Sequence, residues 1–127
     1  MTSELPYKPL IWVETSLRDL REFPEAVRDL MGYALYVAQR GGKHRDAKPL
    51  TGFGGAGVVE IVKDHRGDTF RAVYTVRFHK AVYVLHVFQK KSKAGRETPK
   101  SEMELIKKRL QEAERIAVER SAQEDTP

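Results

Sequence analysis

The strongest constraint on the fold is an apolar segment in the second half of the chain. Residues 81–88 read Ala-Val-Tyr-Val-Leu-His-Val-Phe. Because side chains alternate between the two faces of a strand, this segment presents apolar groups on both faces. A strand of this kind lies in the interior of a sheet that other elements cover on both sides. We therefore predict a central strand at 81–88.

A cluster of cations follows this strand directly. Its members are Lys90, Lys91, Lys93, Arg96 and Lys100, with Glu97 as the one acid among them. Packing a core does not require so many cations at the end of a buried strand, whereas holding a phosphate backbone does. The net charge of +5 and the pI of about 9.5 also favour an anionic partner, either nucleic acid or an acidic protein. A solvated basic surface is the alternative.

Size and composition exclude several classes of protein. The 127 residues suffice for one domain with a modest core. The absence of cysteine excludes disulfides and thiolate metal sites. No apolar run approaches the ~20 residues that span a bilayer, and the N-terminus has no apolar signal core. We expect a soluble, cytoplasmic protein with no membrane partner, no cofactor and no metal, since His44, His65 and His79 are scattered.

Hydrophobic periodicity and turn residues predict an α+β domain with four strands and three helices. The strands are expected at 10–13, 58–63, 69–78 and 81–88. The helices are expected at 16–23, at 24–40 and from Thr98 onward. The glycine-rich residues 43–57 are expected to form a loop.

The predicted architecture has two N-terminal helices and a C-terminal helix around a mainly antiparallel sheet of about four strands. The two early helices are expected to cover one face of the sheet. The other face, beside the cation cluster, is where a large anion would bind. We place the domain at 10–119, with an N-terminal extension at 1–9 and a disordered tail at 120–127.

Five short segments occur in the same order in a known family. They are Lys48-Pro49-Leu50, Val59-Glu60-Ile61, Arg71-Ala72-Val73-Tyr74, the run 85–93 and Thr98-Pro99. Together they resemble the phage-derived HigB-like toxins of the RelE/ParE superfamily of bacterial type II toxin–antitoxin systems. The resemblance implies a small microbial-ribonuclease-like fold and a metal-independent endoribonuclease that cleaves mRNA on the ribosome. It also implies a cognate helix-turn-helix antitoxin and binding of operator DNA by the toxin–antitoxin complex.

For this reaction we predict two groups of residues. The predicted catalytic residues are Arg71, Lys91, Lys93 and His86. The predicted RNA-binding residues are Lys90, Arg96, Lys100, Arg77 and Lys63. Metal-independent cleavage needs a base for the 2′-OH proton, cations for the charge on the phosphate, and an acid for the 5′-oxygen. The guanidinium of Arg71 can bind two phosphate oxygens at once.

Each prediction has a plainer alternative. Arg71 could form a cross-strand ion pair with Glu60, which a four-residue hairpin loop would place opposite it. His86 shares a predicted strand face with Val82, Val84 and Phe88, so it could be a core residue. The lysines could simply bind the RNA backbone without a catalytic role. Glu60 stands where RelE-like enzymes have a cation, which leaves the general base unassigned. A ParE-like inhibitor of gyrase, or an RNA-binding module that does not cleave, is the alternative function.

Overall fold

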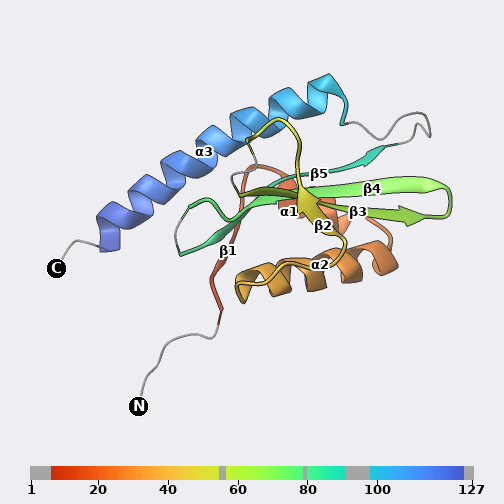
Figure 1. Cartoon of the computed structure of the whole chain (residues 1–127), viewed down its shortest axis with the longest axis horizontal. Helices are drawn as coiled ribbons and strands as arrows, with labels where there is room; N and C mark the ends of the chain where they lie inside the picture. Colours follow the sequence, from red (N-terminus) through yellow and green to blue (C-terminus); the bar gives the residue numbers. More distant parts are fainter. Residues whose placement is uncertain (1–6, 55–56, 79, 91–97, 125–127) are drawn as a thin grey trace, which may run out of the picture.

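The computed structural model describes residues 7–54, 57–78, 80–90 and 98–124. Within them the chain forms one sheet and three helices (Figure 1). The strands are β1 (Leu10–Trp12), β2 (Ala47–Pro49), β3 (Val58–His65), β4 (Asp68–Thr75) and β5 (Val82–Lys90). The helices are α1 (Ser16–Arg21), α2 (Glu25–Gln39) and α3 (Lys100–Glu124). The predicted order of elements is confirmed, with one strand added.

The strands form a mixed sheet in the order β1-β5-β4-β3-β2. Among the described strands, only β1 runs parallel to its neighbour, β5; the other pairs are antiparallel. The predicted α+β class with a mainly antiparallel sheet is therefore confirmed. The additional strand, β2, lies inside the predicted loop 43–57. It is a three-residue edge strand that contains a proline, so neither its length nor its pattern marks it as a strand.

Helices cover the sheet on both faces (Figure 1). On one face, Met31 of α2 packs in a core cluster with Ile61 and Ala72 of the sheet. On the other face, Ile106 of α3 packs in a second cluster with Leu85. Strand β5 is thus buried on both sides for most of its length, as its sequence predicted. The face that we expected to be open to a large anion is partly covered by α3, because the apolar stripe of this helix needs a surface to pack on.

The β3–β4 hairpin ends in the two-residue turn Arg66-Gly67 rather than in the expected four-residue loop. Both residues have positive φ angles, 50° and 86°, as a type I′ turn requires. The resulting register places Val62 opposite Arg71. Glu60 is therefore diagonal to Arg71 on the same face instead of directly opposite, which is still within reach of long side chains.

Strand β5 contains a bulge at Leu85. The ladder pairs Val73 with His86 and Tyr74 with Val84. In a regular strand Val84 and His86 would share a face. The extra residue shifts the alternation by one, so that Val84 packs on the α2 side while His86 faces α3. The prediction that His86 shares a face with Val82 and Val84 is therefore wrong, whereas Phe88, the third residue predicted on that face, does lie beside His86 with ring centres 5.0 Å apart. Alternation cannot reveal a bulge in a segment that is apolar on both faces.

Helix α3 continues to Glu124, past Arg120, where the predicted disordered tail would begin. Residues 120–124 contain no glycine or proline to end the helix, and Arg115 pairs with Glu119 one turn along it. Lys80 also approaches Glu124 at 3.5 Å. Residues 125–127 of the predicted tail lie outside the described residues. None of the described helices, α3 included, is both long enough and apolar enough to cross a membrane.

Candidate active site

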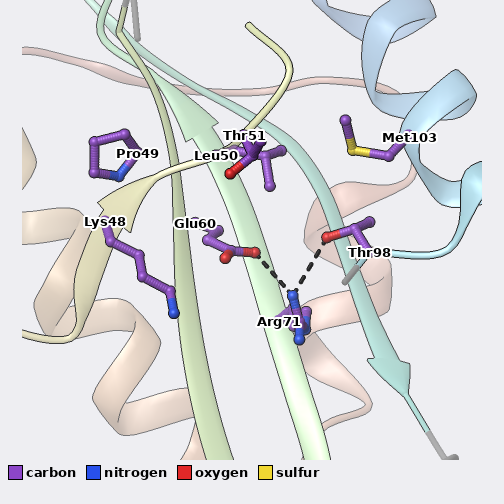
Figure 2. Close-up of a pocket in the computed structure, with 8 residues that line it drawn as sticks. All are labelled: Lys48, Pro49, Leu50, Thr51, Glu60, Arg71, Thr98 and Met103. Carbon is purple, nitrogen blue, oxygen red and sulfur yellow. Dashed lines mark hydrogen bonds and ion pairs between the residues drawn. The ribbon is translucent and has the colours of Figure 1, made fainter. Parts of the chain in front are cut away.

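A cavity of about 540 Å³ lies between the segment that follows β2 and the start of α3. Its lining residues are Lys48, Pro49, Leu50, Thr51, Glu60, Arg71, Thr98 and Met103 (Figure 2). The charged residues come from the three strands β2, β3 and β4. The volume is within the range of small-molecule binding sites. The cavity is therefore large enough for one nucleotide-sized group.

The charged part of the cavity contains a buried ion pair. Nη1 of Arg71 on β4 donates to Oε2 of Glu60 on β3 at 3.1 Å. The same nitrogen donates to Oγ1 of Thr98 at 3.3 Å, which connects the pair to the start of α3 (Figure 2). Only 4% of Arg71 and 6% of Glu60 is exposed. Either charge would be strongly destabilising at this depth without the other. The ion pair therefore holds the guanidinium in a defined position.

Lys48 adds a second cation beside this pair. Strand β2 pairs with β3 so that Lys48 is opposite Glu60 and lies on the same face of the sheet. Lys48 is exposed and lines the cavity. The Glu60 carboxylate thus has a cation on each neighbouring strand. This arrangement can bind an anionic group and place a proton acceptor next to it.

Apolar side chains form the rest of the wall. Leu50 is buried, and Met103 is half-buried on the first turn of α3. Gly52 has a φ of 105° and brings the loop close to this helix, since a Cβ there would lie 3.1 Å from Cε of Met103. Leu50 and Met103 both line the cavity and give it an apolar part beside its charged residues.

His86 lies under α3 and is not among the residues that line the cavity. Its Nε2 is 2.6 Å from Oε2 of Glu102, and its Nδ1 is 3.2 Å from Nη1 of Arg109. Because a guanidinium only donates, Nδ1 accepts and Nε2 carries the proton that bonds to Glu102. Arg109 also donates to the carbonyl of Leu85 at 3.1 Å and to Oγ1 of Thr15 at 3.3 Å. This network fastens α3 to β5 and α1, which favours a structural role for His86.

Burial lowers the pKa of His86 below its ordinary value of 6.5. The charge of Arg109 acts in the same direction, whereas the hydrogen bond and the charge of Glu102, and the charge of Asp19, oppose it. The folded chain therefore takes up this proton at a lower pH than the unfolded chain does. Between the two pKa values the unfolded state binds more protons, so stability decreases as the pH falls.

We accordingly expect the unfolding free energy to decrease as the pH falls below about 6.5 and to level off below the folded-state pKa of His86. The slope of the unfolding free energy against pH should stay below about 1.4 kcal/mol per pH unit, the limit for the uptake of one proton. Urea unfolding of the wild type and of His86→Gln at several pH values measures it. The variant should lose this part of the slope, while His44→Gln, the matched control, should keep it. An identical slope in wild type and His86→Gln would contradict the assignment.

The predicted cation cluster is only partly described. Lys91, Lys93 and Arg96 lie outside the described residues. Lys90 is half-buried at the end of β5, and the register of β4 and β5 puts it on the same face as Arg71. Lys100 is exposed at the first position of α3.

Two other predicted RNA-binding residues lie away from the cavity. Lys63 is paired with Phe70 and faces the α2 side of the sheet, opposite to Arg71. Arg77 lies two residues beyond Thr75, the last residue of β4, and is not among the residues that line the cavity. The structure therefore does not bring Lys63 or Arg77 together with the other predicted site residues.

Apart from Arg71 and His86, the residues of the cavity and of the α3 network were not predicted as site residues. Glu60 was considered only as an ion-pair partner of Arg71. Lys48 and Thr98 occur in the resemblance motifs, but they were expected in a loop and at a helix start. Glu102 and Arg109 are seven residues apart in α3 and flank Ile106 on its buried face. A charge within an apolar helical stripe is the signal that could have identified Arg109. The described residues contain no group of three or more histidine or acidic side chains that could hold a metal ion.

Comparison with known families finds a match over most of the chain. Residues 18–111 match the family model described as phage-derived protein Gp49-like (DUF891). The match covers most of the chain, from α1 into α3. The chain belongs to the phage-derived Gp49-like family. The predicted membership of a phage-derived family is thereby confirmed, although the match does not single out the HigB-like proteins.

Two solved structures are similar to this Gp49-like chain. The toxin–antitoxin complex RelBE2 from Mycobacterium tuberculosis is 20% identical with a TM-score of 0.44, over 72% of this chain and 100% of that chain. An arginine-to-alanine double mutant of the E. coli toxin RelE in the free state is 23% identical with a TM-score of 0.47, over 64% of this chain and 81% of that chain. No curated protein matches the Gp49-like chain significantly.

Proposed function

We propose that this chain is the toxin of a type II toxin–antitoxin system and that it cleaves mRNA on the ribosome. The observation that carries the proposal is the cavity in which the Glu60 carboxylate lies between Lys48 and the buried Arg71. A proton acceptor flanked by two cations matches the needs of phosphodiester cleavage by a neighbouring 2′-OH. The resemblance in sequence supports the same reaction.

In this reaction Glu60 takes the proton of the 2′-OH. The 2′-oxygen then bonds to phosphorus, and the bond from phosphorus to the 5′-oxygen breaks. The products are a 2′,3′-cyclic phosphate and a 5′-hydroxyl, which receives a proton from a general acid. Arg71 and Lys48 stabilise the negative charge that grows on the phosphate oxygens.

The residues outside the described part of the chain keep the roles that we predicted for them. Lys91 or Lys93 is the proposed general acid, and Arg96 a contact to the RNA backbone. Glu60 takes the role of general base that the sequence left unassigned. His86 has no part in the proposed reaction, because the Arg109 network holds it under α3.

The proposed partners are the ribosome with its mRNA and a helix-turn-helix antitoxin whose complex with the toxin binds operator DNA. The gene next to this one is the place to look for the antitoxin. Its co-expression should restore growth to cells in which the toxin has been induced.

Glu60→Gln should reduce cleavage by about 10²- to 10⁴-fold, the range for loss of a general base. Glutamine keeps the shape of the side chain and can still accept from Arg71, but it leaves the buried guanidinium without its counter-charge, so stability should also fall. Primer extension on mRNA incubated with ribosomes and the purified protein measures the rate, and urea unfolding checks the fold. A Glu60→Gln protein as active as the wild type would show that Glu60 is not the base.

Lys48→Met should reduce cleavage by about 10- to 100-fold, the value of one charge-assisted hydrogen bond. Since Lys48 is exposed, stability should change little. Lys107→Met replaces an exposed lysine of α3 outside the cavity lining and should leave the rate unchanged. Intact transcripts together with inhibited DNA supercoiling would instead support a gyrase inhibitor.

A further inference from the structure

The outer side of α2, away from the sheet, carries a stripe of exposed residues. Its members are Glu25, Asp29, Gly32, Tyr33, Tyr36 and Arg40, the last being the C-cap. At about 100° per residue they fall within about a third of the helix circumference. The buried residues of α2 lie on the opposite side and pack on the sheet. The stripe is therefore a continuous exposed surface of charged residues, tyrosines and one glycine.

The fold of the chain does not explain why position 32 of this stripe is a glycine. It lies in the interior of α2, where glycine is less favourable than any residue except proline. A Cβ built on it meets no atom within 4 Å, and its φ is not positive. Neither the backbone conformation nor packing within the described chain requires glycine. Close approach of a second molecule to the helix would require it.

Tyr33 and Tyr36 flank this glycine and remain 59% and 41% exposed. Tyr33 packs edge-on against His44, with ring centres 5.6 Å apart. Tyr36 accepts a hydrogen bond from Nη1 of Arg40 at 3.0 Å and lies beside Tyr7. Rings that are already held lose little entropy on binding. Exposed, oriented tyrosines are typical of the residues that dominate protein interfaces.

We infer that this stripe is the interface of a homodimer in which α2 packs antiparallel against α2 of a second copy. The stripe is self-complementary about the point between Gly32 and Tyr33. With the two-fold axis there, three contacts form twice: Tyr33 on Gly32, Tyr36 on Asp29, and Arg40 on Glu25. Each acid then meets a donor, and Tyr33 meets the position without a side chain. Such reciprocal pairing is the property that an interface between identical surfaces needs.

The proposed dimer is independent of the proposed ribonuclease activity. Helix α2 packs on one face of the sheet, whereas Arg71 and Glu60 lie on the other. Both cavities would therefore stay accessible in the dimer. Because a single helix crossing buries less area than a standard interface, we expect association only at micromolar or higher concentrations.

Sedimentation velocity over a range of protein concentrations tests the inference. The wild type should pass from monomer to dimer as its concentration rises from low micromolar to near-millimolar. Gly32→Leu should raise the dissociation constant by about tenfold or more, since leucine fills the space that Tyr33 of the other copy needs. The same substitution should raise the melting temperature of the monomer, because leucine favours helix and meets no neighbour. Gln111→Leu, which places a leucine on the exposed side of α3 instead, should leave the dimer intact.

Exchanging the charges of Glu25 and Arg40 tests the proposed register of the two α2 helices. Glu25→Arg and Arg40→Glu should each raise the dissociation constant by about tenfold, and the double variant should restore it. Circular dichroism of each variant checks that the helix persists, since both single changes oppose the helix dipole. A wild type that remains monomeric throughout would overturn the inference. So would a dimer that tolerates Gly32→Leu, or one whose affinity the double exchange fails to recover.

Discussion

Arg71→Ala should destabilise the fold by about 3–5 kcal/mol, because it leaves the Glu60 carboxylate buried without its guanidinium. The two side chains are 3.1 Å apart and almost fully buried, so water cannot replace the lost partner. The hydrogen bond from Arg71 to Thr98 is lost as well, which loosens the connection to α3. Urea unfolding followed by circular dichroism measures this loss.

The paired variant Glu60→Leu/Arg71→Met separates stability from activity. Replacing both charges by apolar side chains of similar size should leave stability within about 1 kcal/mol of the wild type, or increase it. Cleavage should nevertheless fall by at least about 10²- to 10³-fold, as for loss of one donor to a developing charge. A stable double variant that still cleaves mRNA would contradict the placement of the active site. Additive destabilisation by the two single changes would contradict the coupling of the pair.

Arg109→Ala should destabilise the chain by about 3–4 kcal/mol. Arg109 is 9% exposed and donates to Leu85, His86 and Thr15, three residues on two other parts of the fold. Hydrogen bonds to a charged group contribute about 1.5–3 kcal/mol, and the loss leaves buried acceptors without a donor. Because the network joins α3 to the sheet, hydrogen exchange should show the amides of α3 losing protection before those of β4 and β5.

Lys108→Ala is the matched control for this change. Lys108 precedes Arg109 in the same helix but is exposed, so its removal should change stability by less than about 0.5 kcal/mol. Arg109→Lys should give an intermediate loss, because an ammonium keeps the charge but not the fork of donors. If Arg109→Ala proves as stable as Lys108→Ala, then apolar packing around Ile106 alone holds α3, and the polar network adds nothing.

The two networks meet α3 at different points. Arg71 reaches it through Thr98, just before its first turn, and Arg109 anchors its middle. Any rearrangement that lifts the start of α3 would also move Thr98 and Met103, and with them one wall of the cavity. The stability of this helix and the shape of the proposed active site are therefore linked.

Much of the architecture followed from local patterns. The run at 81–88 is apolar on both faces, and that property alone requires a central strand with helices on both sides. Helix α2 was evident from its apolar stripe. Arg71 was selected from its motif, and its alternative role, an ion pair with Glu60, is the contact that the structure contains. The two interpretations are compatible, because the pair that holds Arg71 also holds it beside the cavity.

The amino-acid sequence by itself determined the central strand, the three helices and the family, since periodicity and motifs are local properties of the chain. Only the tertiary structure decided which side chains share a face. The bulge at Leu85 turned His86 toward α3, the two-residue turn at Arg66-Gly67 set Glu60 diagonal to Arg71, and a three-residue edge strand brought Lys48 beside them. These placements depend on strand register, which a shift of one residue reverses and which contacts between distant segments decide.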